Sequence, residues 1–114
     1  MKTLENIKLT EKEQSSIKQA VKSLKSELPV SKIILFGSKA RGDSEKYSDI
    51  DLLIITNCPV TSNMREVVSS KLAEINIEND VMISSLVVYE KEWLEGLIHY
   101  TAIYNEVQRD GCLI

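Results

Sequence analysis

The stretch IILFGSKARGDSEKYSDIDLLIIT, residues 33–56, decides how this chain is interpreted. It opens on an apolar run, residues 33–36, which is too short for a helix and begins with β-branched residues, so it predicts a buried strand. Gly37 and Ser38 break that run, and a polar loop with one helical turn is expected over residues 39–48. Residues 49–56 are apolar and β-branched, and they predict a second strand.

Two carboxylates lie close together at the start of the second predicted strand. Asp49 and Asp51 are separated by one residue, and strand side chains alternate, so both point to one face with their Cα atoms about 6.5–7 Å apart. Adjacent carboxylates are costly without a counter-ion. Mg²⁺ binds such oxygen ligands together with substrate phosphates. The pair predicts a divalent metal site, with a solvated strand end as the alternative.

The turn at the end of the first predicted strand has features of a phosphate site. The glycine lets a phosphate approach the backbone, and the free N–H groups of a helical turn attract anions. Ser38 adds a hydroxyl, and Lys39 and Arg41 add cations. Arg41 could equally pair with an acid across the loop, and the turn could simply end the strand. The sequence argues against an ATPase P-loop, because Asp43 stands where its lysine should follow the second glycine.

The rest of the chain predicts three helices and a third strand. Thr10 and Glu13 fit a capping box for a helix that ends at Pro29. We expect a second helix from residue 62 to 75, a turn over 76–79, a strand over 81–89 and a last helix over 90–109, followed by Gly111. The order α-β-β-α-β-α indicates an α/β or α+β fold in one domain, residues 1–114.

Composition excludes several classes of protein. The chain has 114 residues and a formal net charge of −3, which fits a single domain and argues against direct nucleic-acid binding. No stretch approaches the roughly 20 apolar residues that span a bilayer, and the charged N-terminus lacks the apolar segment of a secretory signal. We therefore expect a cytoplasmic protein. Cys58, Cys112 and the single His99 form no local zinc motif.

Gly37-Ser38, ten residues and then Asp49-Ile50-Asp51 resemble the G-S-x10-D-x-D signature of the DNA polymerase β-like nucleotidyltransferase superfamily. The wording GSKARGDSEKYSDIDLLI is similar to its minimal nucleotidyltransferase (MNT) branch. This resemblance implies a small mixed sheet of about three to four strands with helices packed on one side. It also implies ATP or another nucleoside triphosphate as substrate, Mg²⁺ or Mn²⁺ as cofactor, and transfer of a nucleoside monophosphate to a hydroxyl with release of pyrophosphate.

The resemblance also implies roles for individual residues. Asp49 and Asp51 would bridge a metal ion that holds the triphosphate. The N–H groups at Gly37 and the Ser38 hydroxyl would bind the β- and γ-phosphates, and Arg41 would neutralise phosphate charge.

The family uses a third carboxylate on a later strand, where Asp80 is the candidate. Asp80 begins VMISSLVVY, and alternation places it on one face with Met82 and Ser84. As a catalytic residue it would share a second metal ion and serve as the base. Related sequences can carry this acid slightly further into the strand, at Met82 here, and Glu78 is a second candidate. A strand-edge residue without a catalytic role is the alternative.

The minimal branch typically acts with a partner. The resemblance implies a HEPN-domain toxin as partner, with this chain as the antitoxin that transfers AMP to a toxin tyrosine. The alternatives are a binding module that neutralises its partner by contact alone, and a small-molecule transferase of the aminoglycoside type. The predicted last helix has more apolar residues than one stripe needs, which predicts an exposed surface for that partner or for a homo-oligomer. The helix is expected to bury Trp93, Leu94, Leu97, Ile98, Ala102 and Val107, and Tyr100 and Tyr104 are expected in the interface.

Overall fold

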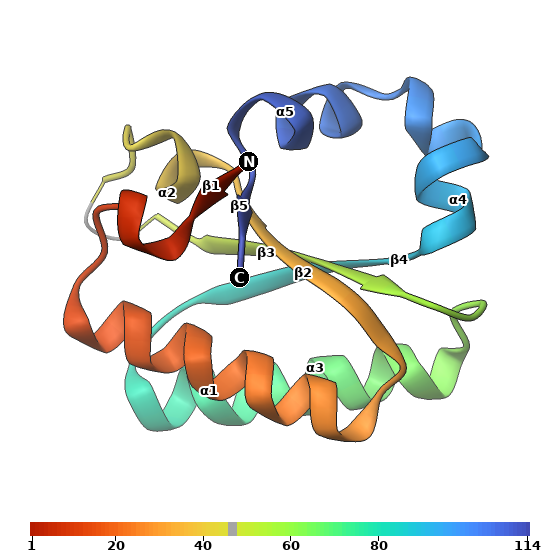
Figure 1. Ribbon diagram of the computed structural model, residues 1–114. Coiled ribbons are helices and arrows are strands. Elements are labelled where there is room, and N and C mark those ends of the chain that lie inside the picture. The colour runs from red at the N-terminus through yellow and green to blue at the C-terminus, as the bar shows by residue number, and fades with distance from the viewer. Residues whose placement is uncertain (46–47) are drawn as a thin grey trace.

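The computed structural model describes residues 1–45 and 48–114. The predicted loop over 39–48 therefore lies partly outside the described residues. The predicted helices and strands follow one another in the predicted order, with short extra elements that include those at both ends of the chain (Figure 1). They are β1 (Lys2–Thr3), the 3₁₀ helix η1 (Leu4–Asn6), α1 (Glu11–Glu27), β2 (Val30–Phe36), α2 (Ser38–Arg41), β3 (Ile50–Thr56), α3 (Ser62–Asn79), β4 (Ile83–Tyr89), α4 (Glu90–Glu95), the 3₁₀ helix η2 (Leu97–Tyr100), α5 (Ala102–Asp110) and β5 (Cys112–Leu113).

The sheet is mixed and has five strands in the order β1-β5-β2-β3-β4. β2 pairs antiparallel with β3, and β3 pairs parallel with β4 through the crossover helix α3. β1 and β5, the first and last strands along the chain, have only two residues each and pair parallel with one another. The predicted mixed sheet and α+β class are confirmed, and β1 and β5 bring the strand number above the predicted three to four.

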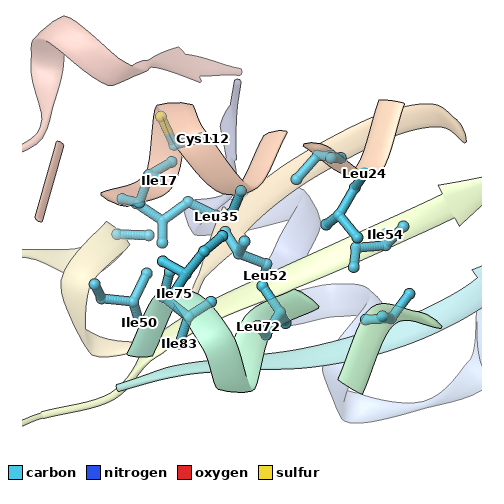
Figure 2. Packing of buried hydrophobic residues seen from close by; sticks show 14 of the residues in the cluster. Ile17, Leu24, Leu35, Ile50, Leu52, Ile54, Leu72, Ile75, Ile83 and Cys112 are labelled. Carbon is cyan, nitrogen blue, oxygen red and sulfur yellow. The ribbon is translucent and has the colours of Figure 1, made fainter. Parts of the chain in front are cut away.

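One face of the sheet packs on α1 and α3. The capping box that opens α1 is present, because Thr10 Oγ1 accepts the Glu13 N–H at 3.1 Å and Glu13 Oε1 accepts the Thr10 N–H at 3.0 Å. Apolar side chains of both helices meet alternate residues of the strands, as Figure 2 shows. This core includes Ile17 and Leu24 from α1, Leu72 and Ile75 from α3, and Leu35, Ile50, Leu52, Ile54 and Ile83 from the sheet.

Helices cover the other face of the sheet as well, so the prediction of helices on one side is wrong. α4, η2 and α5 lie opposite α1 and α3 (Figure 1). The remaining strand residues point into this second core, because side chains of a strand alternate between faces. Its buried members are Ile34, Leu53, Ile55, Val88, Trp93 and Val107. β3 is therefore covered by apolar side chains on both faces.

The predicted last helix is three short helices. Gly96 interrupts it: a Cβ at this glycine would lie 2.7 Å from the Glu92 carbonyl oxygen. The break at Gly96 separates α4 from η2. The apolar side chains that one continuous helix was expected to bury are therefore not all buried. Leu94, Leu97 and Ala102 are exposed instead. Gly111 follows the end of α5, as predicted.

α3 is longer than predicted and absorbs the expected turn at residues 76–79. Asn76 explains this, since its side chain bonds to both backbone groups of Ile83: Oδ1 accepts the N–H at 2.8 Å and Nδ2 donates to the carbonyl at 3.1 Å. A helical Asn76 thus clamps the start of β4. In the described residues we find no helix with the length and apolar character needed to cross a membrane.

The second core predicts a contrast between two neighbouring residues of α4. Trp93 is 3% exposed and packs on Tyr104 with ring centroids 4.9 Å apart, whereas Leu94 is 55% exposed. Trp93→Ala should lower the free energy of unfolding by about 3–5 kcal/mol, and Leu94→Ala by no more than about 0.5 kcal/mol. Urea unfolding measures both, and equal losses would show that α4 does not cover a core.

Candidate functional site

Asp51 lies where three strands and a turn meet. Its neighbours in the sheet are Phe36 of β2 and Ser84 of β4. The Ser84 hydroxyl donates a hydrogen bond of 2.6 Å to Asp51 Oδ1. The other oxygen, Oδ2, faces Gly37, because a Cβ built on that glycine would be only 2.2 Å away from it. The carboxylate is thus held between β4 and the turn that follows β2.

That turn has the backbone geometry that requires glycine. Gly37 has φ +77° and ψ −159° and precedes the short helix α2. The Arg41 N–H donates to the Gly37 carbonyl at 3.1 Å, and the Gly42 N–H donates to the Ser38 carbonyl at 3.0 Å. The predicted helical turn after Gly37-Ser38 is therefore present, and the first N–H groups of a helix have no partner within it.

Asp49 directly precedes β3 and is exposed. The Ile50 N–H donates to the Met82 carbonyl at 2.8 Å, which fixes the start of β3 beside β4. Ile50 is buried in the core under α1 and α3. Asp51 follows Ile50 within β3 and therefore points to the opposite face, whereas Asp49 lies one residue before the strand.

Asp80 lies apart from this pair. It ends α3 in the left-handed conformation, φ 52° and ψ 51°, and its fully exposed carboxylate lies 3.8 Å from Lys12 Nζ. The prediction that Asp80 begins the strand is wrong, because β4 starts only at Ile83. Within residues 1–45 and 48–114, no three Asp, Glu, His or Cys side chains gather as a metal site. The structure therefore does not assemble the predicted carboxylate triad, and Glu78 is exposed on α3.

Lys39 is buried and pairs with an acid of α1. Its Nζ lies 2.7 Å from Glu13 Oε2, and both side chains are largely covered. Burial alone raises the pKa of Glu13, but hydrogen bonds from Lys39 and Thr10 outweigh it and hold this pKa below its usual value. The ion pair ties α2 to the first turn of α1.

Arg41 pairs with acids, which was one of its two predicted roles. Its Nη1 lies 2.6 Å from Glu106 Oε1 of α5, and its Nε lies 3.2 Å from Asp43 Oδ2. The hydrogen bond to Asp43 raises the pKa of Arg41 above its usual value. Lys39 and Arg41, the two cations of α2, are therefore both paired with acids.

These donors fit a hard divalent cation. Two carboxylates and a hydroxyl are oxygen ligands of the kind Mg²⁺ takes, and the glycine at position 37 lets Asp51 Oδ2 come against the turn, because this oxygen occupies the place where a Cβ would stand. A family model described as "Nucleotidyltransferase domain" matches residues 17–107. This chain belongs to the nucleotidyltransferase domain family.

A curated protein resembles part of this chain. A Methanocaldococcus jannaschii protein named "Putative protein adenylyltransferase MJ0604" is 53% identical over 45 residues, which are 38% of this chain and 45% of that protein. The match thus spans less than half of that relative's length.

Solved structures agree on the fold. A toxin–antitoxin crystal structure with AMP-PNP matches 84% of this chain and 69% of its own, with TM-score 0.60 and 16% identity. A nucleotidyltransferase structure from Sulfolobus solfataricus matches 93% of this chain and 87% of its own, with TM-score 0.56 and 22% identity. At these identities the likeness shows the nucleotidyltransferase fold alone.

Sequence reasoning missed three contacts of the site: Ser84 on Asp51, Glu13 on Lys39 and Glu106 on Arg41. The alternation of the third strand does place Ser84 on the same face as the predicted acid, so its face could be found. Its position opposite Asp51 depends on strand register. The two glutamates come from other helices, and no local signal connects them with the turn.

Gly37 and Gly42 allow a matched test of the site. Both have positive φ, but a Cβ at Gly42 meets nothing within 4 Å, whereas one at Gly37 collides with Asp51. Gly42→Ala should cost about 1 kcal/mol of backbone strain and leave Mg-ATP affinity unchanged. Gly37→Ala should cost more and weaken Mg-ATP binding at least tenfold, because Asp51 must move. Urea unfolding and calorimetry measure both effects. Equal Mg-ATP affinities for the two variants would show that Gly37 does not influence metal binding at Asp49 and Asp51.

Proposed function

We propose that this domain is a Mg²⁺-dependent nucleotidyltransferase that transfers AMP from ATP to a hydroxyl, most specifically to a tyrosine of a HEPN-type toxin partner. The observation that carries the proposal is the contact of Asp51 with the turn at Gly37. This contact brings the Asp51 carboxylate directly beside a turn suited to phosphate, and in the proposal Asp51 binds the metal ion together with Asp49.

The relatives support the nucleotide and the type of transfer. The M. jannaschii relative carries the name of a protein adenylyltransferase, and the structural neighbour of similar fold was crystallised with AMP-PNP as part of a toxin–antitoxin complex. Together with the matched family model, these names favour AMP as the transferred group and a toxin as the acceptor.

In this proposal the residues of the chain have separate tasks. Asp49 and Asp51 hold Mg²⁺, which when bound supplies positive charge at the phosphates. The N–H groups at Gly37 and Ser38 and the Ser38 hydroxyl orient the β- and γ-phosphates. The acceptor hydroxyl oxygen bonds to the α-phosphorus and its proton passes to water, while the bond from this phosphorus to the oxygen that bridges to the β-phosphate breaks and pyrophosphate leaves. Arg41 reaches phosphate only by leaving Glu106 or Asp43.

A second candidate is a module that neutralises its partner by contact alone. The position of Asp80 favours it, because a third carboxylate is missing from the described part of the site. The two candidates differ in one measurable property, since only the first one labels the partner with AMP.

If Asp49 and Asp51 bind the metal ion, substituting both should weaken Mg-ATP binding, whereas substituting Asp80 should not. Asp49→Asn with Asp51→Asn should weaken Mg-ATP binding at least tenfold, because the cation loses both charged ligands. Asp80→Asn is the control, and it should bind Mg-ATP as wild type does, since its side chain faces solvent near Lys12. Calorimetry compares the three proteins, and unchanged affinity in the double variant would refute the metal site.

Transfer is followed with the purified HEPN-type partner and two labelled substrates. ATP labelled at the α-phosphate should mark the partner, and ATP labelled at the γ-phosphate should not. Asp80→Asn should keep this activity. An unlabelled partner that still binds tightly would favour neutralisation by contact.

The partner should dock on the exposed apolar surface of η2 and its flanking helices. Leu97 is 87% and Tyr100 is 80% exposed, with Leu94 and Ile103 beside them in the chain. Exposed apolar patches mark interaction sites. Tyr104 is excluded from this surface, because it is half-buried and stacks on Trp93 and His99.

Leu97→Glu with Tyr100→Glu should weaken partner binding at least tenfold, because both side chains are lost from the interface. Ile77→Glu is the matched control, because Ile77 is 83% exposed on α3, away from η2. Calorimetry with the partner measures the affinity, and light scattering tests self-association of the chain alone. Equal affinity for the double variant and the control would place the interface elsewhere.

A further inference from the structure

Ser84 occupies the position in β4 that directly faces Asp51. The parallel register pairs these two residues, and the Ser84 hydroxyl donates to Asp51 Oδ1 at 2.6 Å. On the other side of Asp51 the β2 neighbour is Phe36, which has no ligand atom. Within the described residues, the one protein group that hydrogen-bonds to the Asp51 carboxylate is therefore the neutral Ser84 hydroxyl.

This hydrogen bond decides which oxygen of Asp51 is available. Oδ1 accepts from Ser84, while Oδ2 lies against the Gly37 turn, where phosphate is proposed to bind. A hydrogen bond to a carboxylate is strong and directional, so Ser84 restricts rotation of the carboxylate and keeps Oδ2 towards the turn. Ser84 therefore acts on the metal site through Asp51.

The neutral group also limits the charge of the site. Two divalent ions held side by side need carboxylates that bridge them and further ligands for the second ion. Asp49 and Asp51 are the acids present, and no group of three potential ligands gathers in the part of the chain that the structure describes. Asp80, which could have supplied the charge, ends α3 in solvent.

We infer that Ser84 is a positioning residue for Asp51, and that it takes the place of a third carboxylate, so that this chain binds one divalent ion with its nucleotide and not two. The inference rests on the proposed function, because it concerns the same metal site. It goes beyond it by assigning a role to Ser84 and an ion number to the complex.

The number of ions is measured directly with Mn²⁺ and a non-hydrolysable ATP analogue. Electron paramagnetic resonance counts bound Mn²⁺ per protein–nucleotide complex. Wild type should bind one ion and Ser84→Asp should bind two, because the new carboxylate stands at hydrogen-bonding range of Asp51. Ser85→Asp is the matched control, since Ser85 is exposed and points to the opposite face, and it should bind one. Two ions on wild type, or one on Ser84→Asp, would overturn the inference.

Stability provides a second readout that needs no activity. Without metal, three adjacent carboxylates repel one another, so Ser84→Asp should melt below wild type in EDTA and gain more from Mn²⁺ than wild type does. Ser85→Asp should gain as wild type does. Equal gains for the two variants would contradict a site at Ser84.

The hydroxyl is tested by removing and restoring it. Ser84→Ala should weaken Mn²⁺-nucleotide binding about fivefold, the equivalent of about 1 kcal/mol for one hydrogen bond, and Ser84→Thr should restore it. Unchanged affinity in Ser84→Ala would remove the positioning role. Failure of the proposed function is distinguishable, because Asp49→Asn with Asp51→Asn would then leave Mn²⁺-nucleotide binding unchanged, whatever residue 84 is.

Discussion

The burial of β3 on both faces is the constraint on which the site depends. Its residues from Leu52 to Thr56 are all buried, and the strand lies between β2 and β4. A shift of one residue would turn every side chain to the other face and carry Asp51 into the core under α1 and α3. The apolar residues of β3 therefore fix where the carboxylate stands, and the register with β4 then brings Ser84 to it.

Within the described residues, the two cations of α2 are each paired with acids. Lys39 is taken up by Glu13 and Arg41 by Glu106 and Asp43. Glu13 serves twice, since one oxygen caps α1 and the other binds Lys39. These ion pairs fasten α2 to a helix on each face of the sheet, so the turn beside Asp51 is anchored from both sides.

Local pattern predicted the elements well where one period dominated. The strands that contain Leu35 and Leu52 and the capped helix at Thr10 are confirmed. Gly96 was overlooked, because a single glycine within a helical pattern is often tolerated. The second face was missed because an alternating strand does not say what covers its far side. Trp93 and Val107 cover that side by sharing a core with Leu53, and this contact exists only in the tertiary structure.

The sequence by itself determined the family and the fold class, and it supplied Asp49 and Asp51 as the candidates for metal binding. The spacing of these two residues is a local property of the sequence, whereas the need for glycine at position 37 comes from tertiary pairing, because a Cβ there would collide with Asp51 of the neighbouring strand. Only the tertiary structure decided what stands opposite Asp51. Asn76 bonds to Ile83 and lets α3 continue to Asn79, which leaves Asp80 in a left-handed turn outside the sheet. The pairing of Ser84 with Asp51 could not be predicted from a strand expected to begin at residue 81. Strand register is set by long-range pairing and helix length rather than by neighbouring residues.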